Sequence, residues 1–159
     1  MGNFAEGKSL GDLVQALHAL NNTAVTAGGG GDNTEVNGVV FERGVDFDES
    51  HESGVFIIHG VSTIASNETL AIIANVQTDS AVGMATAPRD LDETLSTVIE
   101  DAGAGSQNVV AVLPFKLGPA DKCIRLQMTP NMSAGATDTA ALTASLIVGG
   151  GRKIPASTA

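Results

Sequence analysis

The feature that most constrains the fold of this chain is a period-two alternation of apolar and polar residues in several short segments. In residues 124–129 the even positions hold Ile, Leu and Met, and the odd positions hold Arg, Gln and Thr. Residues 70–77, 109–117 and 142–148 also carry apolar residues at every second position. Because successive side chains of a strand point to opposite faces of a sheet, this pattern predicts half-buried β-strands.

Three further segments have strand character of different kinds. Residues 36–43 and 55–64 are rich in Val, Ile and Phe, and residues 94–100 are a weaker candidate. The 55–64 segment is apolar on both faces, which is typical of a central strand. Residues 79–92 contain Pro88 and are expected to form a loop.

Clusters of Gly, Asp, Asn, Ser and Pro separate these segments, as is typical of tight turns. Seven or eight short strands without an intervening helical repeat predict a mainly β chain. We expect an antiparallel β-sandwich with jelly-roll topology. The 159 residues fit one domain, and the core must be aliphatic because Trp and Tyr are absent and only five Phe occur.

The N-terminal segment follows a different spacing, that of one helix face. The residues on this face are Leu10, Leu13, Val14, Leu17 and Leu20. The chain is therefore predicted to divide into an N-terminal amphipathic helical arm (1–26), a glycine-rich hinge (27–33), a β-sandwich domain (34–149) and a C-terminal tail (150–159).

An isolated helix of this length is marginal in water, so its apolar face must dock on another surface. Two surfaces stay open: the sandwich of the same chain, or another protein chain. In the second case the arm and the basic residues of the tail form an interface. The candidate interface residues are Phe4, Leu10, Leu13, Val14, Leu17, Leu20, Arg152 and Lys153.

No motif for phosphate or metal binding is complete. The glycine run at 28–31 lacks the Lys of a phosphate-binding loop, and the Asp32 that follows would repel phosphate. Residues 46–52 carry acidic or hydroxyl side chains at alternate positions, as a calcium loop begins. The Gly and Glu that such a loop needs at its sixth and twelfth positions are replaced by His51 and Ile57. We expect an exposed, solvated loop there.

The residues that carry catalysis elsewhere are also scattered here. His18, His51 and His59 lack the spacing of zinc ligands, and Cys123 is the single cysteine. We expect His18 to pack or to contact a neighbouring chain, His59 to be hydrogen-bonded within a sheet, and Cys123 to be a passive thiol. The sequence thus predicts no catalytic residue, no metal site and no cofactor, and the chain is not expected to be an enzyme.

The charge balance bears on the partners. Eight basic against 18 acidic residues give a formal net charge of −10, and the basic residues are not clustered. Nucleic-acid binding is therefore not expected, because affinity for phosphate backbones comes from cations. The apolar runs are much shorter than the roughly 20 residues that cross a bilayer, so no membrane contact is expected. No secretory signal is apparent, and we expect synthesis in a reducing cytoplasm.

Three segments together resemble a known class of proteins. Residues 141–155, close to the C-terminus, hold an apolar strand followed by glycines, Arg152, Lys153 and Pro155. Residues 122–129 place Arg125 within alternating apolar positions, and residues 70–79 lead into Ser80. These segments are similar to the last, penultimate and mid-chain strands of small virion structural proteins of tailed bacteriophages.

This resemblance implies a head decoration, or cement, protein that binds the major capsid protein on the outside of the capsid. It further implies a homotrimer, made in the bacterial host cytoplasm and located on the virion surface. Two alternatives stay open. One is a tail or collar adaptor or fibre component of a virion. The other is a non-viral, lectin-like ligand-binding β-sandwich, which the absence of Trp and Tyr disfavours.

Overall fold

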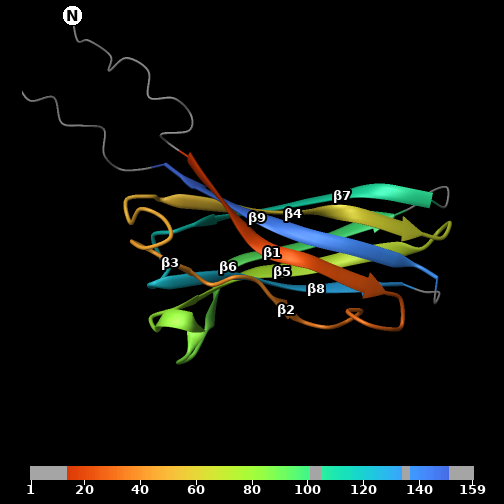
Figure 1. The fold of residues 1–159 in the computed structure, drawn as a ribbon, viewed down its shortest axis with the longest axis horizontal. Helices are drawn as coiled ribbons and strands as arrows, with labels where there is room; N and C mark the ends of the chain where they lie inside the picture. The colour runs from red at the N-terminus through yellow and green to blue at the C-terminus, as the bar shows by residue number, and fades with distance from the viewer. Residues whose placement is uncertain (1–13, 101–104, 134–136, 151–159) are drawn as a thin grey trace, which may run out of the picture.

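The structure, a computed structural model, describes residues 14–100, 105–133 and 137–150. Within these ranges the chain forms nine β-strands and one short 3-10 helix, arranged in two layers (Figure 1). The elements are β1 (Val14–Thr26), β2 (Val36–Asn37), β3 (Phe41–Glu42), β4 (Ser53–Ile64), β5 (Thr69–Asp79), η1 (Val82–Met84), β6 (Arg89–Glu100), β7 (Gly105–Lys116), β8 (Cys123–Met132) and β9 (Thr139–Gly149).

The two layers are antiparallel sheets. One is four-stranded with the order β1-β9-β4-β7, and the other is five-stranded with the order β2-β8-β5-β6, where β3 also pairs with β8. The strand pairings within both sheets are antiparallel. The chain passes from one sheet to the other at every connection except β2–β3 and β5–β6. The predicted mainly β, antiparallel architecture is confirmed.

The core lies between the sheets and is aliphatic, as expected. The inward positions of β4 and β9 and those of β5 and β8 belong to one hydrophobic cluster. Its largest fully buried side chains on these strands are Phe56, Ile58, Ile64, Leu70, Ile72, Ile124, Leu126, Met128, Leu142 and Leu146. The Phe56 and Phe115 rings stack at a centroid distance of 5.3 Å. The period-two alternations in the sequence therefore identified the core faces correctly.

The predicted N-terminal helix is wrong for residues 14–26, which form the edge strand β1 paired with β9. Two β-bulges, one between His18 and Leu20 and one between Leu20 and Thr23, explain the misleading spacing. Each bulge adds one residue and reverses which face the next side chains occupy, so Leu17 and Leu20 both pack on the core. A strand also gains ladder hydrogen bonds to β9, whereas a lone helix would be marginal.

The predicted glycine hinge at 27–33 is a hydrogen-bonded turn that continues from β1. Gly28 and Gly31 adopt positive φ angles of 64° and 80°, which glycine accommodates without strain. The Asp32 carboxylate accepts backbone N–H bonds from Met132 in β8 and from Gly28, both at 2.8 Å. These bonds hold the pKa of Asp32 below its usual value. The turn thus anchors β1 to the body, and the sandwich begins with β1 instead of at residue 34.

Residues 36–43, expected as one strand, form β2 and β3 with a break between them. At the break, Gly38 N donates to Leu126 O in β8 at 2.8 Å, and Val39 N donates to Ala19 O in β1 at 2.7 Å. The segment therefore joins the edges of both sheets. The segment 55–64, expected to be a central strand, forms β4, which lies between β9 and β7, so that prediction is confirmed. The loop expected at 79–92 is confirmed only in part, because it contains η1 and the start of β6.

Candidate interaction surface

The solvent-facing side of the sheet β1-β9-β4-β7, here called the β4 face, presents apolar side chains along β4 and β7. In β4 the side chains alternate between the core and this face, which places Val55, Ile57, His59 and Val61 outward. In β7 the outward residues include Val110 and Val112, and in β9 they include Ile147. Strands with both faces apolar are typical of sheets covered on both sides.

The strand register brings these side chains together. Ile57 lies opposite Val112, and Val55 lies between Pro114 on β7 and Ile147 on β9. Val110 is 64% exposed, Val112 49% and Val61 48%. The result is an apolar patch along β4 and the edge strand β7, with His59 within it. It is bordered by Ser145 and Thr143 of β9, which lie opposite Ile57 and His59, and by Asn108 of β7, which lies opposite Val61.

The β4 face also lacks acidic residues. The chain has 18 Asp and Glu, yet none occurs in β1, β4, β7 or β9. Lys116, at the end of β7, is the one Lys or Arg in these four strands. By contrast, β6 alone carries four acidic residues in its sequence. These four strands thus carry no negative charge and one positive charge, on a chain of net charge −10.

The outer face of the other sheet carries a hydrogen-bonded polar network, beside which Ile73 and Val98 are exposed at 49% and 55%. Arg125 Nε and one of its terminal nitrogens donate to Gln77 Oε1 at 2.9 and 2.7 Å, and Gln77 Nε2 donates to Asp90 Oδ1 at 3.2 Å. A second pair joins Gln127 Nε2 to Asn37 Oδ1 at 3.2 Å. These amides and charges bond to one another across the strands, so this face suits contact with water.

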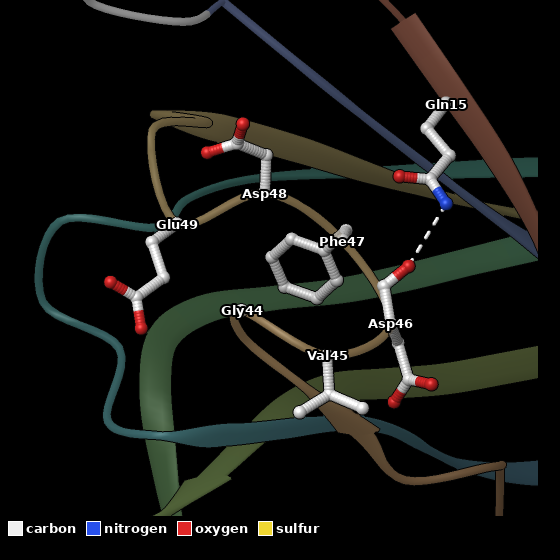
Figure 2. A pocket seen from close by; sticks show the side chains of 7 residues that line it. All are labelled: Gln15, Gly44, Val45, Asp46, Phe47, Asp48 and Glu49. Atoms are coloured by element: carbon white, nitrogen blue, oxygen red, sulfur yellow. Dashed lines mark hydrogen bonds between the residues drawn. The ribbon is translucent and has the colours of Figure 1, made fainter.

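The acidic loop that follows β3 borders a shallow hollow of about 500 Å³ beside β1 (Figure 2). Gln15 Nε2 donates to the Asp46 carbonyl oxygen at 2.9 Å, and the Asp46 carboxylate accepts from Glu42 N at 2.7 Å. Phe47 is buried and anchors the loop, whereas Asp46, Asp48 and Glu49 are exposed.

In Figure 2 the carboxylates of the acidic loop point in different directions and do not converge on a common point. Among the described residues, no group of three or more His, Cys, Asp or Glu is placed to hold a metal ion. The loop carboxylates are exposed, as the sequence predicted, but the loop is anchored through the buried Phe47 instead of being wholly solvated.

The predicted interface residues do not gather into one surface. Leu20 is 5% exposed and belongs to the core, and its predicted interface role is wrong because β1 turns it inward. Leu17 and Val14 are half-buried in β1, with Leu17 packed on the core. Phe4, Leu10, Leu13, Arg152 and Lys153 lie outside the described residues.

The remaining singled-out residues have simple environments. His18 is exposed, and its Nε2 hydrogen-bonds with Asn21 Oδ1 at 2.9 Å. His59 is exposed on the β4 face. Cys123 is buried at the start of β8, and burial raises the pKa of its thiol. A buried thiol of raised pKa is a poor nucleophile, which fits the passive role predicted for it.

The residues of the apolar patch were missed as a site when the sequence was read. The signal was the two-sided apolarity of residues 55–64, interpreted only as a mark of a central strand. A central strand with one wet face needs apolar residues on one side alone, as β8 shows with its outward Arg125 and Gln127. The outward Val55, Ile57 and Val61 therefore already indicated that the outer face of this strand is apolar.

No helix among the described residues is long and apolar enough to cross a membrane. No protein-family profile and no curated protein matches this sequence. Among solved structures, a chain from the structure of infectious bursal disease virus, Gx strain, is similar, with a TM-score of 0.44 and 10% sequence identity. The similarity covers 89% of this chain and 32% of that chain, so this chain spans about a third of its length. At this TM-score the similarity carries no argument about function.

Proposed function

We propose that this protein is a non-enzymatic virion structural protein that decorates the outside of a capsid and reinforces it through protein–protein contacts. The observation that carries the proposal is the β4 face, whose strands carry no carboxylate and which presents an apolar patch on β4 and β7. The sequence resemblance to virion structural proteins of tailed bacteriophages supplies the kind of partner, which is the major capsid protein. Copies are expected to associate as a homotrimer.

The strand order supports the finer assignment of a jelly roll. If β2 and β3 are counted as one interrupted strand along β8, each sheet has four strands. The chain then alternates between the sheets, and only β5 and β6 are consecutive neighbours in one sheet. Eight antiparallel strands in two sheets are the organisation of a jelly roll.

The β4 face has the physical properties that a protein interface requires. Val and Ile have few χ1 rotamers, so little side-chain entropy is lost when a partner covers them. Four strands spaced about 4.8 Å apart and 11–13 residues long give a face of roughly 700 Å². A stable interface buries about 800 Å² on each partner, so a partner could cover most of this face. No carboxylate on these strands would have to be desolvated.

The first test is binding to purified capsid shells assembled from the major capsid protein alone. The full chain is mixed with the shells and sedimented, and the amount bound is measured against chain concentration. We expect saturable binding, with chain density on the outer shell surface in particle images. Multivalent attachment would make this binding much tighter than that of a single contact.

Two outcomes would contradict the proposal. Folded protein that does not sediment with the shells would show that it is not a decoration protein. Density found along the tail or collar of a complete particle, and not on the shell, would instead support the tail adaptor or fibre alternative. Heat treatment of decorated and bare shells adds a functional measure, because a cement protein raises the temperature at which the shell opens.

A further inference from the structure

We propose that the β4 face is the surface through which copies of this chain associate, so that in the assembled protein it is covered by another copy. The inference deepens the proposed function, which requires protein–protein contacts but does not say which surface joins which chains. It depends on the charge, area and chemistry of the described strands.

Charge is the first argument. Each copy has a formal net charge of −10, so two copies repel one another wherever their carboxylates face each other. The strands β1, β4, β7 and β9 contain no Asp or Glu, so two copies can meet there without apposing like charges from these strands. The opposite sheet includes the acidic strand β6 and offers no such contact.

The same charge pattern argues against other partners. A basic protein would find no carboxylate on the strands of the β4 face to pair with, and an acidic one would find Lys116 alone. The complementary surface is therefore uncharged and apolar. Another copy of this chain has such a surface in its own β4 face. Its strands have the same twist, which lets two sheets stack closely.

Area is the second argument. The face of roughly 700 Å² per copy approaches the 800 Å² per partner of a stable interface. Val110 and Val112, on the edge strand β7, are the most exposed apolar side chains of the patch at 64% and 49%. Covering the most exposed apolar side chains removes the most apolar area from water, so these two valines are the residues to change.

Two geometries satisfy the inference. If the faces of two copies stack on one another, the contact is isologous and closes as a dimer. If the face of one copy receives a different surface of the next, the contact is heterologous and can close as the trimer that the sequence resemblance implies, and the charge argument then requires that this second surface also lack carboxylates. In both cases the occupant of the face is a copy of this chain.

The experiment compares two matched substitutions in the full chain, Val112→Asp and Val98→Asp. Both valines lie in the edge strands of their sheets, β7 and β6, and they are 49% and 55% exposed. Each substitution introduces one carboxylate into an exposed strand position, but only Val112 lies on the β4 face. Sedimentation velocity at micromolar concentration gives the oligomeric state, and circular dichroism with thermal unfolding checks the fold.

We expect the unchanged chain and Val98→Asp to sediment as the same oligomer. Val112→Asp is expected to dissociate into a 16.0 kDa monomer, with the dissociation constant raised at least 100-fold. Should Val112→Asp fail to fold, the double substitution Val110→Thr with Val112→Thr retains β-branched side chains and is expected to weaken association several-fold. A monomeric unchanged chain, or equal association of Val112→Asp and Val98→Asp, would overturn the inference.

The same variants separate this inference from the proposed function. If Val112→Asp keeps its oligomeric state but no longer binds shells, the β4 face contacts the shell, so the inference fails and the proposed function stands. If the oligomer depends on Val112 but the unchanged chain never binds shells, the proposed function fails and the inference stands.

Discussion

Gly60 in β4 lies so close to the backbone of Ala141 in β9 that a Cβ atom at residue 60 would overlap the Ala141 carbonyl oxygen. The same Cβ would also lie 3.0 Å from the carbonyl carbon of Ala141 and 3.1 Å from the Cα of Leu142. A backbone neighbour cannot move aside as a flexible side chain can. The close pairing of β4 with β9 therefore depends on the missing side chain of Gly60.

Substitution Gly60→Ala is expected to lower the free energy of unfolding by about 1–3 kcal/mol, the usual cost of overpacking. Chemical denaturation measures the change. Gly118→Ala is the control, because a Cβ at Gly118 meets no atom within 4 Å. Equal stabilities of the two variants would show that β4 and β9 do not approach as closely as described.

Leu20→Ala is expected to cost about 2–4 kcal/mol of unfolding free energy, because Leu20 is buried in the core beside β9. In a detached helix the same change would be nearly neutral or stabilising, since Ala is the best helix former. Equilibrium unfolding in urea distinguishes the two cases. Ala16→Ser, at an exposed position of the same strand, serves as the control and is expected to change little.

Two carboxylates make stability sensitive to acid. Asp79 accepts backbone N–H bonds from Ala81 and Thr86, each at 3.0 Å, and from Ala87 at 3.2 Å, and these bonds lower its pKa. The pKa of Asp32 is lowered by its bonds from Met132 and Gly28. A lowered pKa in the folded state gives stability that is present above the ordinary pKa of about 4 and is lost as the pH falls toward the lower value.

The melting temperature is therefore expected to be nearly constant from pH 7 to pH 5 and to fall below about pH 4. Asp79→Asn and Asp32→Asn should each lower it at pH 7 and make its fall in acid shallower. Glu35→Gln, at an exposed position of the β1–β2 connection, removes one negative charge without those backbone bonds. If it changes the acid profile as much as Asp79→Asn does, general charge repulsion is responsible instead of the backbone bonds.

The thiol of Cys123 should report on opening of the sandwich. Burial raises its pKa, which reduces both its thiolate fraction and its access to reagents. Reaction with an aromatic disulfide reagent at pH 8 is expected to be at least 100-fold slower in the native protein than in the denatured chain. Comparable rates in the two states would show that the start of β8 is open.

Local alternation was sufficient to predict most of the core. Ile72, Leu126 and Leu142 are fully buried in the strands that the sequence indicated, because a period of two leaves one consistent face to bury. The loop at 79–92 was less well predicted. The strand β6 begins at Arg89 with mostly polar residues, and only its part beyond residue 94 is apolar enough to indicate a strand. Strand boundaries depend on pairing partners that local sequence does not reveal.

The sequence by itself determined that this chain is built of β-strands around an aliphatic core and that its acidic residues are unevenly distributed. Only the tertiary structure decided that Leu20 lies in a bulged edge strand, because the hydrogen bonds that favour a strand over a helix come from β9 at the far end of the chain. Only the sheet order decided that β1, β4, β7 and β9, separated in the sequence, lie side by side. Non-local strand pairing therefore turns four separate acid-free segments into one continuous surface.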